Sequence, residues 1–105
     1  MEIKFIRGDN HQVRFRFTNF EGNIEKMFLT VKCKNKYPRI RKKLNKGIVY
    51  NDGWYYVEFV PTDTEWLDCS EMAYDIEIVT GSKKYTVLKD RFVLEEDITT
   101  PDCEV

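Results

Sequence analysis

The sequence predicts an all-β fold, an immunoglobulin-like antiparallel β-sandwich of seven to eight strands with one short helical turn at residues 62–68. Two observations lead to this prediction. Apolar and polar residues alternate with a period of two over short segments, as they do in strands with one buried and one solvated face. These segments are regularly spaced with turn residues between them, and no amphipathic segment is long enough for a stable independent helix.

The first half of the chain shows this alternation most clearly. Residues 2–7 and residues 12–18 are predicted strands on either side of a Gly-Asp-Asn turn, whose residues tolerate positive φ angles. A third strand follows a second turn and continues the same alternation. The inner faces of the second and third strands carry Val13, Phe15, Phe17, Met27, Leu29 and Val31.

Residues 32–46 form a basic stretch that contains eight Lys and Arg residues and no acidic residue. We interpret it as an edge strand, because lysine, arginine and Pro38 at a sheet edge hinder pairing with another chain. Tyr37 lies among the cations, so the stretch could follow the phosphates of a nucleic acid. A strand would send alternate cations to opposite faces, which makes nucleic acid an improbable partner.

The strongest hairpin signal is the Asn-Asp-Gly turn at residues 51–53, because Asp-Gly suits positive φ at consecutive positions. The strand that follows, residues 54–60, directs Trp54 and Tyr56 outward. Its inner face carries Tyr55, Val57 and Phe59. Phe28 points outward on the third strand, and the three outward aromatic residues predict an apolar patch of the kind that marks protein interfaces. A slip of one residue would bury them instead.

A short helical turn is predicted next, at residues 62–68. Thr62 and Glu65 have the spacing of a capping box. Trp66 and Leu67 follow, and both could dock on the core. We expect this turn to carry the chain from one sheet of the sandwich to the other.

Tyr74 opens the predicted strand at residues 74–80, directly after this crossing. A tyrosine in that place is similar to the tyrosine corner of immunoglobulin-like domains, whose hydroxyl bonds to upstream backbone. Ile76 and Ile78 of the same strand are expected in the core. Residues 83–94 form the last strand or two short ones, with Leu88, Phe92 and Leu94 as the expected buried residues. We expect a β-sandwich domain at residues 1–95 and an acidic C-terminal tail at residues 96–105. A five-stranded barrel is the structural alternative.

Charge is distributed unevenly along the chain. Residues 1–50 hold 13 Lys and Arg residues against 4 acidic ones, and residues 51–105 hold 4 against 14. If the strands keep these charges apart, the molecule has a basic face and an acidic face, which suits association with copies of itself or with protein partners. The predicted interface residues are Phe28, Trp54, Tyr56, Lys32, Lys34, Arg39, Arg41 and Lys43.

The three cysteines, Cys33, Cys69 and Cys103, are odd in number and far apart, with no C-x-x-C pair. We therefore expect reduced thiols and neither a disulfide framework nor a zinc site. The chain has no apolar run of membrane-spanning length and no signal-peptide core at its start, so synthesis in the cytoplasm without a membrane partner is expected.

No residue pattern predicts catalysis. His11 is the sole histidine and stands beside a turn, without a nucleophile motif nearby in sequence. Asp75 and Glu77 share one face of a strand, as solubility alone would require. We therefore predict a protein that is not an enzyme and has no catalytic residue, metal, cofactor or small-molecule substrate.

Several segments resemble small phage and prophage proteins of Gram-positive bacteria, in which an immunoglobulin-like module is linked to tail and baseplate structure, as in the N-terminal region of baseplate upper proteins. The resembling segments are Ile6-Arg7-Gly8-Asp9, Val13-x-Phe15-x-Phe17, Gly53-x-Tyr55-x-Val57-x-Phe59, Asp63-Thr64-x-x-Leu67, Tyr74-Asp75-Ile76-Glu77-Ile78, Thr86-x-Leu88, Phe92-x-Leu94 and Asp97-Ile98-Thr99. They are core and turn positions spread over most of the chain.

The resemblance implies a non-enzymatic structural protein of a phage tail or baseplate that binds other virion proteins or copies of itself. Its implied location is the bacterial cytoplasm during assembly, with the virion as a further location. The alternative is a small phage-encoded accessory or inhibitor protein that binds a host protein, or less readily a nucleic acid through residues 32–46.

Overall fold

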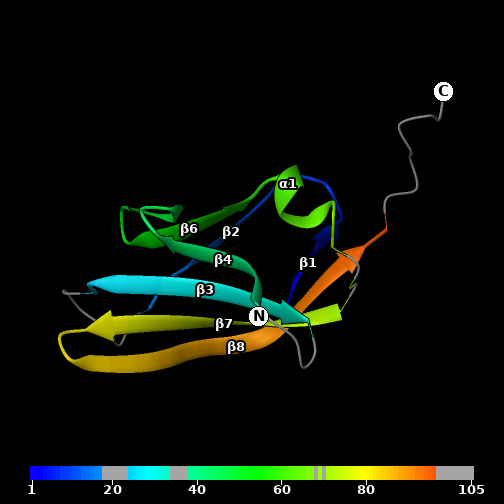
Figure 1. Cartoon of the computed structure of the whole chain (residues 1–105). Coiled ribbons are helices and arrows are strands. Elements are labelled where there is room, and N and C mark those ends of the chain that lie inside the picture. Colours follow the sequence, from blue (N-terminus) through cyan, green and yellow to red (C-terminus); the bar gives the residue numbers. More distant parts are fainter. Residues whose placement is uncertain (18–23, 34–37, 68, 70, 97–105) are drawn as a thin grey trace.

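The computed structural model describes residues 1–17, 24–33, 38–67, 69 and 71–96 (Figure 1). Lys34 and nearly all of the predicted acidic tail lie outside the described residues. The strands are β1 (Ile3–Ile6), β2 (His11–Phe15), β3 (Lys26–Cys33), β4 (Pro38–Leu44), β5 (Gly47–Asn51), β6 (Trp54–Phe59), β7 (Glu71–Thr80) and β8 (Lys83–Glu95). One helical turn, α1 (Pro61–Thr64), lies between β6 and β7. The predicted all-β class is confirmed.

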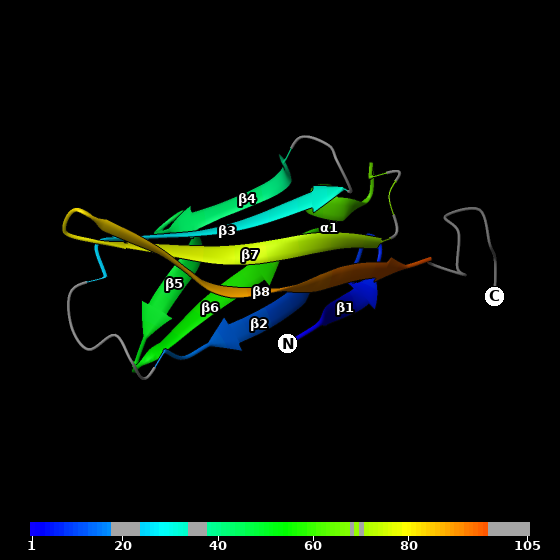
Figure 2. The same cartoon turned by 90° about the horizontal axis from the view of Figure 1, so that it is seen from below.

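The eight strands form one mixed sheet in the order β1-β8-β7-β3-β4-β5-β6-β2, which curls into a nearly closed, barrel-like shape. Figures 1 and 2 show β3, β7 and β8 side by side in one layer and β6 and β2 in the other. The expectation that all pairs are antiparallel is wrong, because β1 runs parallel to β8 and β4 runs parallel to β5. The structural alternative, a five-stranded barrel, is also wrong, because the sheet has eight strands.

A tight turn carries the chain from one layer to the other between β4 and β5. Lys43 and Lys46 exchange backbone hydrogen bonds of 2.9 and 2.8 Å, and Asn45 and Gly47 both have positive φ. After this turn β5 runs parallel to β4, and the two strands share only two residue pairs, Lys43 with Gly47 and Leu44 with Ile48. The layers are therefore joined at this seam over a very short length.

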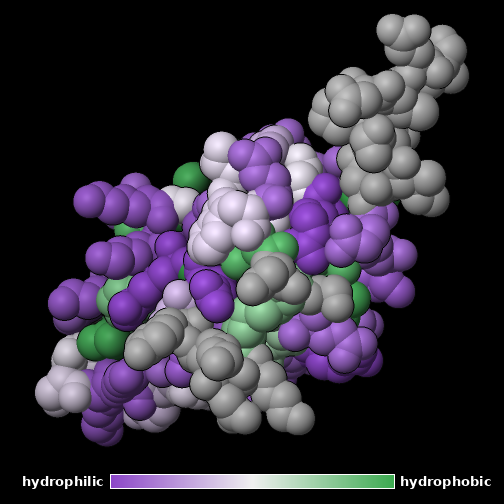
Figure 3. Space-filling model, turned by 45° about the vertical axis from the view of Figure 1, so that its right-hand side comes forward, coloured by the Kyte–Doolittle hydropathy of each residue, from purple (hydrophilic) through white to green (hydrophobic). Residues whose placement is uncertain are grey.

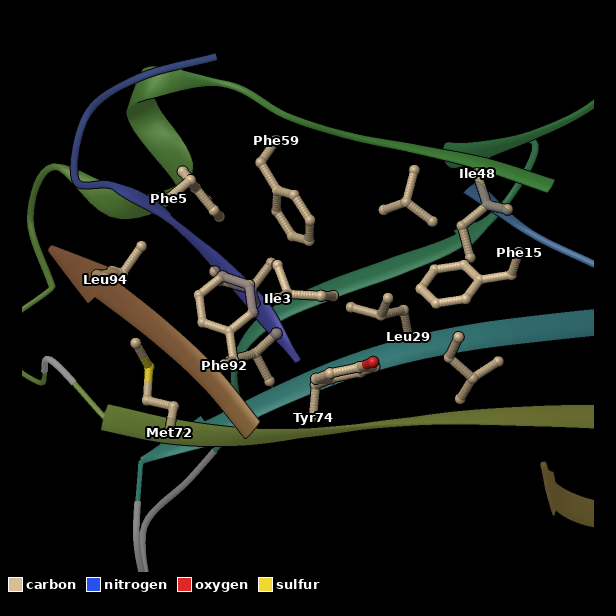
Figure 4. Packing of buried hydrophobic residues seen from close by; sticks show 14 of the residues in the cluster. Ile3, Phe5, Phe15, Leu29, Ile48, Phe59, Met72, Tyr74, Phe92 and Leu94 are labelled. Atoms are coloured by element: carbon tan, nitrogen blue, oxygen red, sulfur yellow. The ribbon is translucent and has the colours of Figure 1, made fainter. Parts of the chain in front are cut away.

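The core lies between the two layers and contains the residues that alternation predicts (Figure 4). Buried side chains of the predicted inner faces include Phe15, Met27, Leu29, Val31, Val57, Phe59, Ile76, Ile78, Phe92 and Leu94. Val13, Phe17 and Tyr55 are partly buried and pack against this core. Phe59 contacts Phe5 and Phe92, with ring centroids 5.4 Å apart in each pair, so one end of the core is aromatic.

The predicted capping box of α1 is wrong. Pro61 is the first helical residue, and its fixed φ suits that position, so the cap is Val60 and Thr62 lies inside the helix. The Asp63 carboxylate accepts a hydrogen bond of 2.8 Å from the Val60 backbone N–H, and Glu65 lies at the C-terminal end.

Of the two side chains expected to dock on the core after α1, one does so. Leu67 is buried, as predicted. Trp66 is 57% exposed, because its indole N–H donates to the Thr62 carbonyl at 2.7 Å and the ring lies along the helical turn instead.

The basic strand β4 is an edge over part of its length. It lies inside the strand order, but residues 38–42 pair with β3 alone, since the pairing with β5 begins at Lys43. Lys42 points toward α1, where its Nζ lies 2.7 Å from the Asp63 carboxylate.

The Arg7 guanidinium joins four segments at the end of the molecule where β8 finishes. It donates to the carbonyls of Thr64, Leu67 and Cys69, the last at 3.1 Å, and to the Glu96 carboxylate at 3.1 Å. The Arg7 side chain is 13% exposed. It therefore ties β1 to α1, to the α1–β7 connection and to the end of β8.

A disulfide joins Cys33 to Cys69, so the prediction of reduced thiols is wrong for these two residues. Their sequence separation of 36 concealed the pairing. The antiparallel register of β3 with β7 places Cys33 opposite Met72, which brings the end of β3 beside the α1–β7 connection where Cys69 lies. Cys103 is outside the described residues.

We expect one reactive thiol in the oxidised folded protein and three after reduction in denaturant, measured by thiol labelling and mass spectrometry. Replacing Cys33 and Cys69 by serine should lower the free energy of unfolding by about 4 kcal/mol in urea titrations. Without the disulfide, the unfolded chain regains the conformational entropy that a closed loop of this length removes. Cys103→Ser is the control and should leave stability unchanged. Three reactive thiols in the folded protein would contradict the disulfide.

Arg7→Ala should lower the free energy of unfolding by about 3 kcal/mol, because three backbone carbonyls and a carboxylate lose a shared donor. Arg7→Lys should recover little, since one ammonium cannot reproduce the planar set of donors. Arg91→Ala is the matched control: its carboxylate contacts are 3.6 and 4.0 Å long and exposed, so a loss below about 0.5 kcal/mol is expected. Equal losses for Arg7→Ala and Arg91→Ala would refute the role of Arg7.

Candidate binding faces

The first candidate is the outer surface of β3 and β4, here called the β3–β4 face and made of Lys26, Phe28, Thr30, Lys32, Arg41 and Lys43. Strand alternation points these side chains away from the core, and the register places Phe28 beside Lys43 and Thr30 beside Arg41. The Arg41 guanidinium lies over the Phe28 ring, 4.9 Å from its centroid. This contact combines an aromatic ring and a cation on a surface that is basic on the β4 side and is bordered on the β7 side by Glu77, opposite Phe28, and Asp75, opposite Thr30.

A cavity of about 380 Å³ opens at the end of the β3–β4 face near the β4–β5 turn. Its walls combine the apolar residues Met27, Phe28 and Leu44 with Asn45 and with three lysines, Lys26, Lys43 and Lys46, against one carboxylate, Glu25. In the view of Figure 3 most of the described surface is hydrophilic, and hydrophobic residues appear as small separate areas. A cavity of this composition suits an acidic partner that also carries an apolar group.

The predicted separation of basic and acidic faces is wrong on this layer. The acidic strand β7 lies between the basic strands β3 and β8. The Glu77 carboxylate lies 3.3 Å from Lys84 Nζ, and Asp75 is directly opposite Lys89. The charges of the two chain halves therefore interleave, and the cations that remain without an ion pair among the described residues are concentrated on β3 and β4.

The second candidate is the outer surface of the other layer, here called the β2–β5–β6 face and made of Gln12, Arg14, Arg16, Gly47, Val49, Asn51, Trp54, Tyr56 and Glu58. Tyr56 lies at its centre, with Val49 opposite on β5 and Arg14 opposite on β2. The guanidinium groups of Arg14 and Arg16 lie 4.1 and 5.5 Å from the Trp54 ring centroid. Both arginines alternate with the inward residues Val13, Phe15 and Phe17 and so lie on the outer face, but the sequence did not show that β2 pairs with β6.

The structure divides the predicted interface residues between these two faces. Trp54 and Tyr56 lie on the β2–β5–β6 face, and Phe28 lies on the opposite layer with Lys32, Arg41 and Lys43, so the three aromatic residues do not form one patch. Arg39 is partly buried, and its Nε has no hydrogen-bond partner among the described residues.

Tyr74 is buried in the middle of β7, and its hydroxyl donates to the backbone carbonyl of Met1. A tyrosine corner bonds to backbone a few residues upstream, whereas this bond reaches the start of the chain. Burial raises the pKa of Tyr74 to about 12, and the negative charge of Asp90 adds to the effect. Hydrogen bonds from the Met1 amino group and from the Arg91 backbone lower the pKa of Asp90.

His11 has a structural position, because its ring stacks on Phe5 with centroids 4.6 Å apart. Within the described residues no group of three or more His, Cys, Asp and Glu side chains is arranged to hold a metal ion. No helix in the described part of the chain has the length and apolarity needed to cross a membrane.

Comparison with known proteins places the fold but not a family. No protein-family profile and no curated protein matches the sequence significantly. Among solved structures, the chain is similar to a "putative glycoside hydrolase" from Bacteroides vulgatus, with a TM-score of 0.54 and 18% sequence identity over 90% of this chain. The match covers 16% of that protein, so the two share a domain fold, and at this identity the likeness extends no further.

Tyr74→Phe should cost about 1 kcal/mol of unfolding free energy at pH 7, because the bond to the Met1 carbonyl is lost. The difference between wild type and variant should shrink from pH 9 to pH 11. Unfolded tyrosine ionises near pH 10 while folded Tyr74 stays protonated until about 12, so the wild type loses stability as pH rises through this window. Urea titrations across this range test the prediction, and a difference that stays constant would contradict it.

Proposed function

We propose that the chain is a non-enzymatic protein-interaction module of a phage or prophage tail or baseplate, built on an immunoglobulin-like β-sandwich. The strand neighbours support the sandwich: β8-β7-β3 follow the G-F-C order of immunoglobulin domains, and β5-β6-β2 follow the D-E-B order. α1 lies between β6 and β7, where those domains cross from one sheet to the other. The short β4–β5 seam then joins two sheets that are otherwise distinct.

The observation that carries the proposal is the Phe28–Arg41 contact, which has three lysines of β3 and β4 near it. Aromatic residues and arginine are enriched among the residues that dominate protein-binding energy, and peripheral charges steer the approach of an oppositely charged partner. Lys26, Lys32 and Lys43 lie on the same face as the contact and form no ion pair with other described residues. This arrangement fits an acidic surface on another virion protein or on a second copy of the chain.

Assembly in the bacterial cytoplasm and transfer into the virion follow from the same proposal. The Cys33–Cys69 disulfide would then close after the protein leaves the reducing cytoplasm, where disulfides rarely persist. A host-directed accessory protein would use the same face against a host protein, and a nucleic-acid binder would use it against phosphates, so the partner that binds distinguishes the three functions.

The test is light scattering of the purified protein, together with binding assays against purified tail proteins of the same phage or prophage, at low and high salt. We expect self-association or binding to a tail protein at low salt, weakened by high salt because exposed charges are screened. Arg41→Glu should weaken it at least about tenfold, since it removes the stacked cation and repels an acidic partner.

Lys83→Glu is the matched control, because it makes the same charge change at the start of β8, which β7 separates from the β3–β4 face, and it should bind as the wild type does. A strictly monomeric protein that binds no tail protein would overturn the proposal. Binding to short DNA in its place, lost in Arg41→Glu, would assign the face to nucleic acid.

A further inference from the structure

The β2–β5–β6 face contains a shallow cavity of about 420 Å³ that the proposed function does not use. Its lining consists of Gln12, Gly47, Val49, Asn51, Tyr56 and Glu58. The register explains why these residues meet: Gln12 lies opposite Glu58, Val49 opposite Tyr56, and Asn51 opposite Trp54. The volume falls within the range of sites for small organic ligands.

The cavity combines an apolar centre with hydrogen-bonding groups around it. The Tyr56 ring is half-buried beside the exposed Val49 side chain, which makes a flat apolar area. Gln12 and Asn51 each offer an amide donor and an amide acceptor, and Glu58 offers a carboxylate. None of these three side chains forms a hydrogen bond or ion pair with another described residue, so all remain available to a ligand.

A neutral sugar matches these groups better than other ligand classes do. One face of a pyranose ring is lined by C–H groups that stack on an aromatic ring, and its hydroxyls both donate and accept hydrogen bonds, as amides and carboxylates require. An anionic ligand would meet the Glu58 carboxylate. An apolar protein side chain would bury Gln12 and Asn51 without partners, at a cost in free energy.

Arg14 adds donors at the border of the cavity. It lies opposite Tyr56, and its guanidinium is held over the Trp54 ring at 4.1 Å. We propose that this cavity is a binding site for a neutral saccharide unit, which stacks on Tyr56 and bonds through its hydroxyls to Gln12, Asn51 and Glu58. The site lies on the opposite layer from the β3–β4 face and does not depend on the function proposed there.

The experiment is an NMR titration of the ¹⁵N-labelled protein with oligomers of glucose, galactose and N-acetylglucosamine. Binding of at least one oligomer with a Kd of about 1 mM should shift the side-chain amides of Gln12 and Asn51 and the backbone amide of Tyr56, and it should change Trp54 fluorescence. Tyr56→Ala should weaken binding at least tenfold, whereas Tyr56→Phe should retain most of it because the ring remains.

Trp66→Ala is the matched control: it removes an exposed aromatic residue outside the face and keeps Trp54 as the fluorescent reporter. Glu58→Ala is a second test at an exposed position. It should also weaken binding, and it keeps the proposal testable if Tyr56→Ala fails to fold. The proposal is overturned if no oligomer shifts these resonances at 20 mM, if binding survives both substitutions, or if Trp66→Ala abolishes it.

Discussion

The fold depends on how Arg7 satisfies the irregular backbone between α1 and β7. Carbonyl groups outside regular structure need donors when they are shielded from water. The Arg7 guanidinium supplies them to Leu67 and Cys69, is a second donor to the Thr64 carbonyl at the end of α1, and also holds Glu96. The crossing between layers is thereby fixed in place, so β7 enters the sheet between β3 and β8 with its apolar residues facing the core.

Local pattern was sufficient to predict which side chains fill the core. Leu29, Val57 and Ile76 were assigned inward from alternation alone, and all three are buried. Alternation depends on neighbouring residues and carries no information on which strands pair. The disulfide, the parallel β1–β8 pair and the ligands of Arg7 join segments far apart in sequence, so no local pattern could reveal them.

The two candidate binding faces show the same limit, because alternation gives the side of a strand on which a residue lies but not the layer to which the strand belongs. Alternation directed Phe28, Trp54 and Tyr56 outward, but it could not show that β3 and β6 belong to opposite layers, and the predicted patch became two surfaces. The acidic residues of β7 were expected to form part of a separate acidic face, yet the strand order places β7 between the basic strands β3 and β8. Arg14 and Arg16 were visible as outward cations in the sequence, while their aromatic partner, Trp54, comes from a strand that only the fold identifies.

The disulfide also decides how the domain would respond to a pulling force on its ends. The covalent link between Cys33 and Cys69 encloses β4, β5, α1 and β6, so tension bypasses that whole segment. The 36-residue separation withholds about 120 Å of chain from extension, at 3.3–3.6 Å per residue. The strand that supplies Arg41 and the strand that supplies Tyr56 both lie inside this loop and cannot be extended while the bond holds, whereas β2 and β3, which complete the two faces, lie outside it.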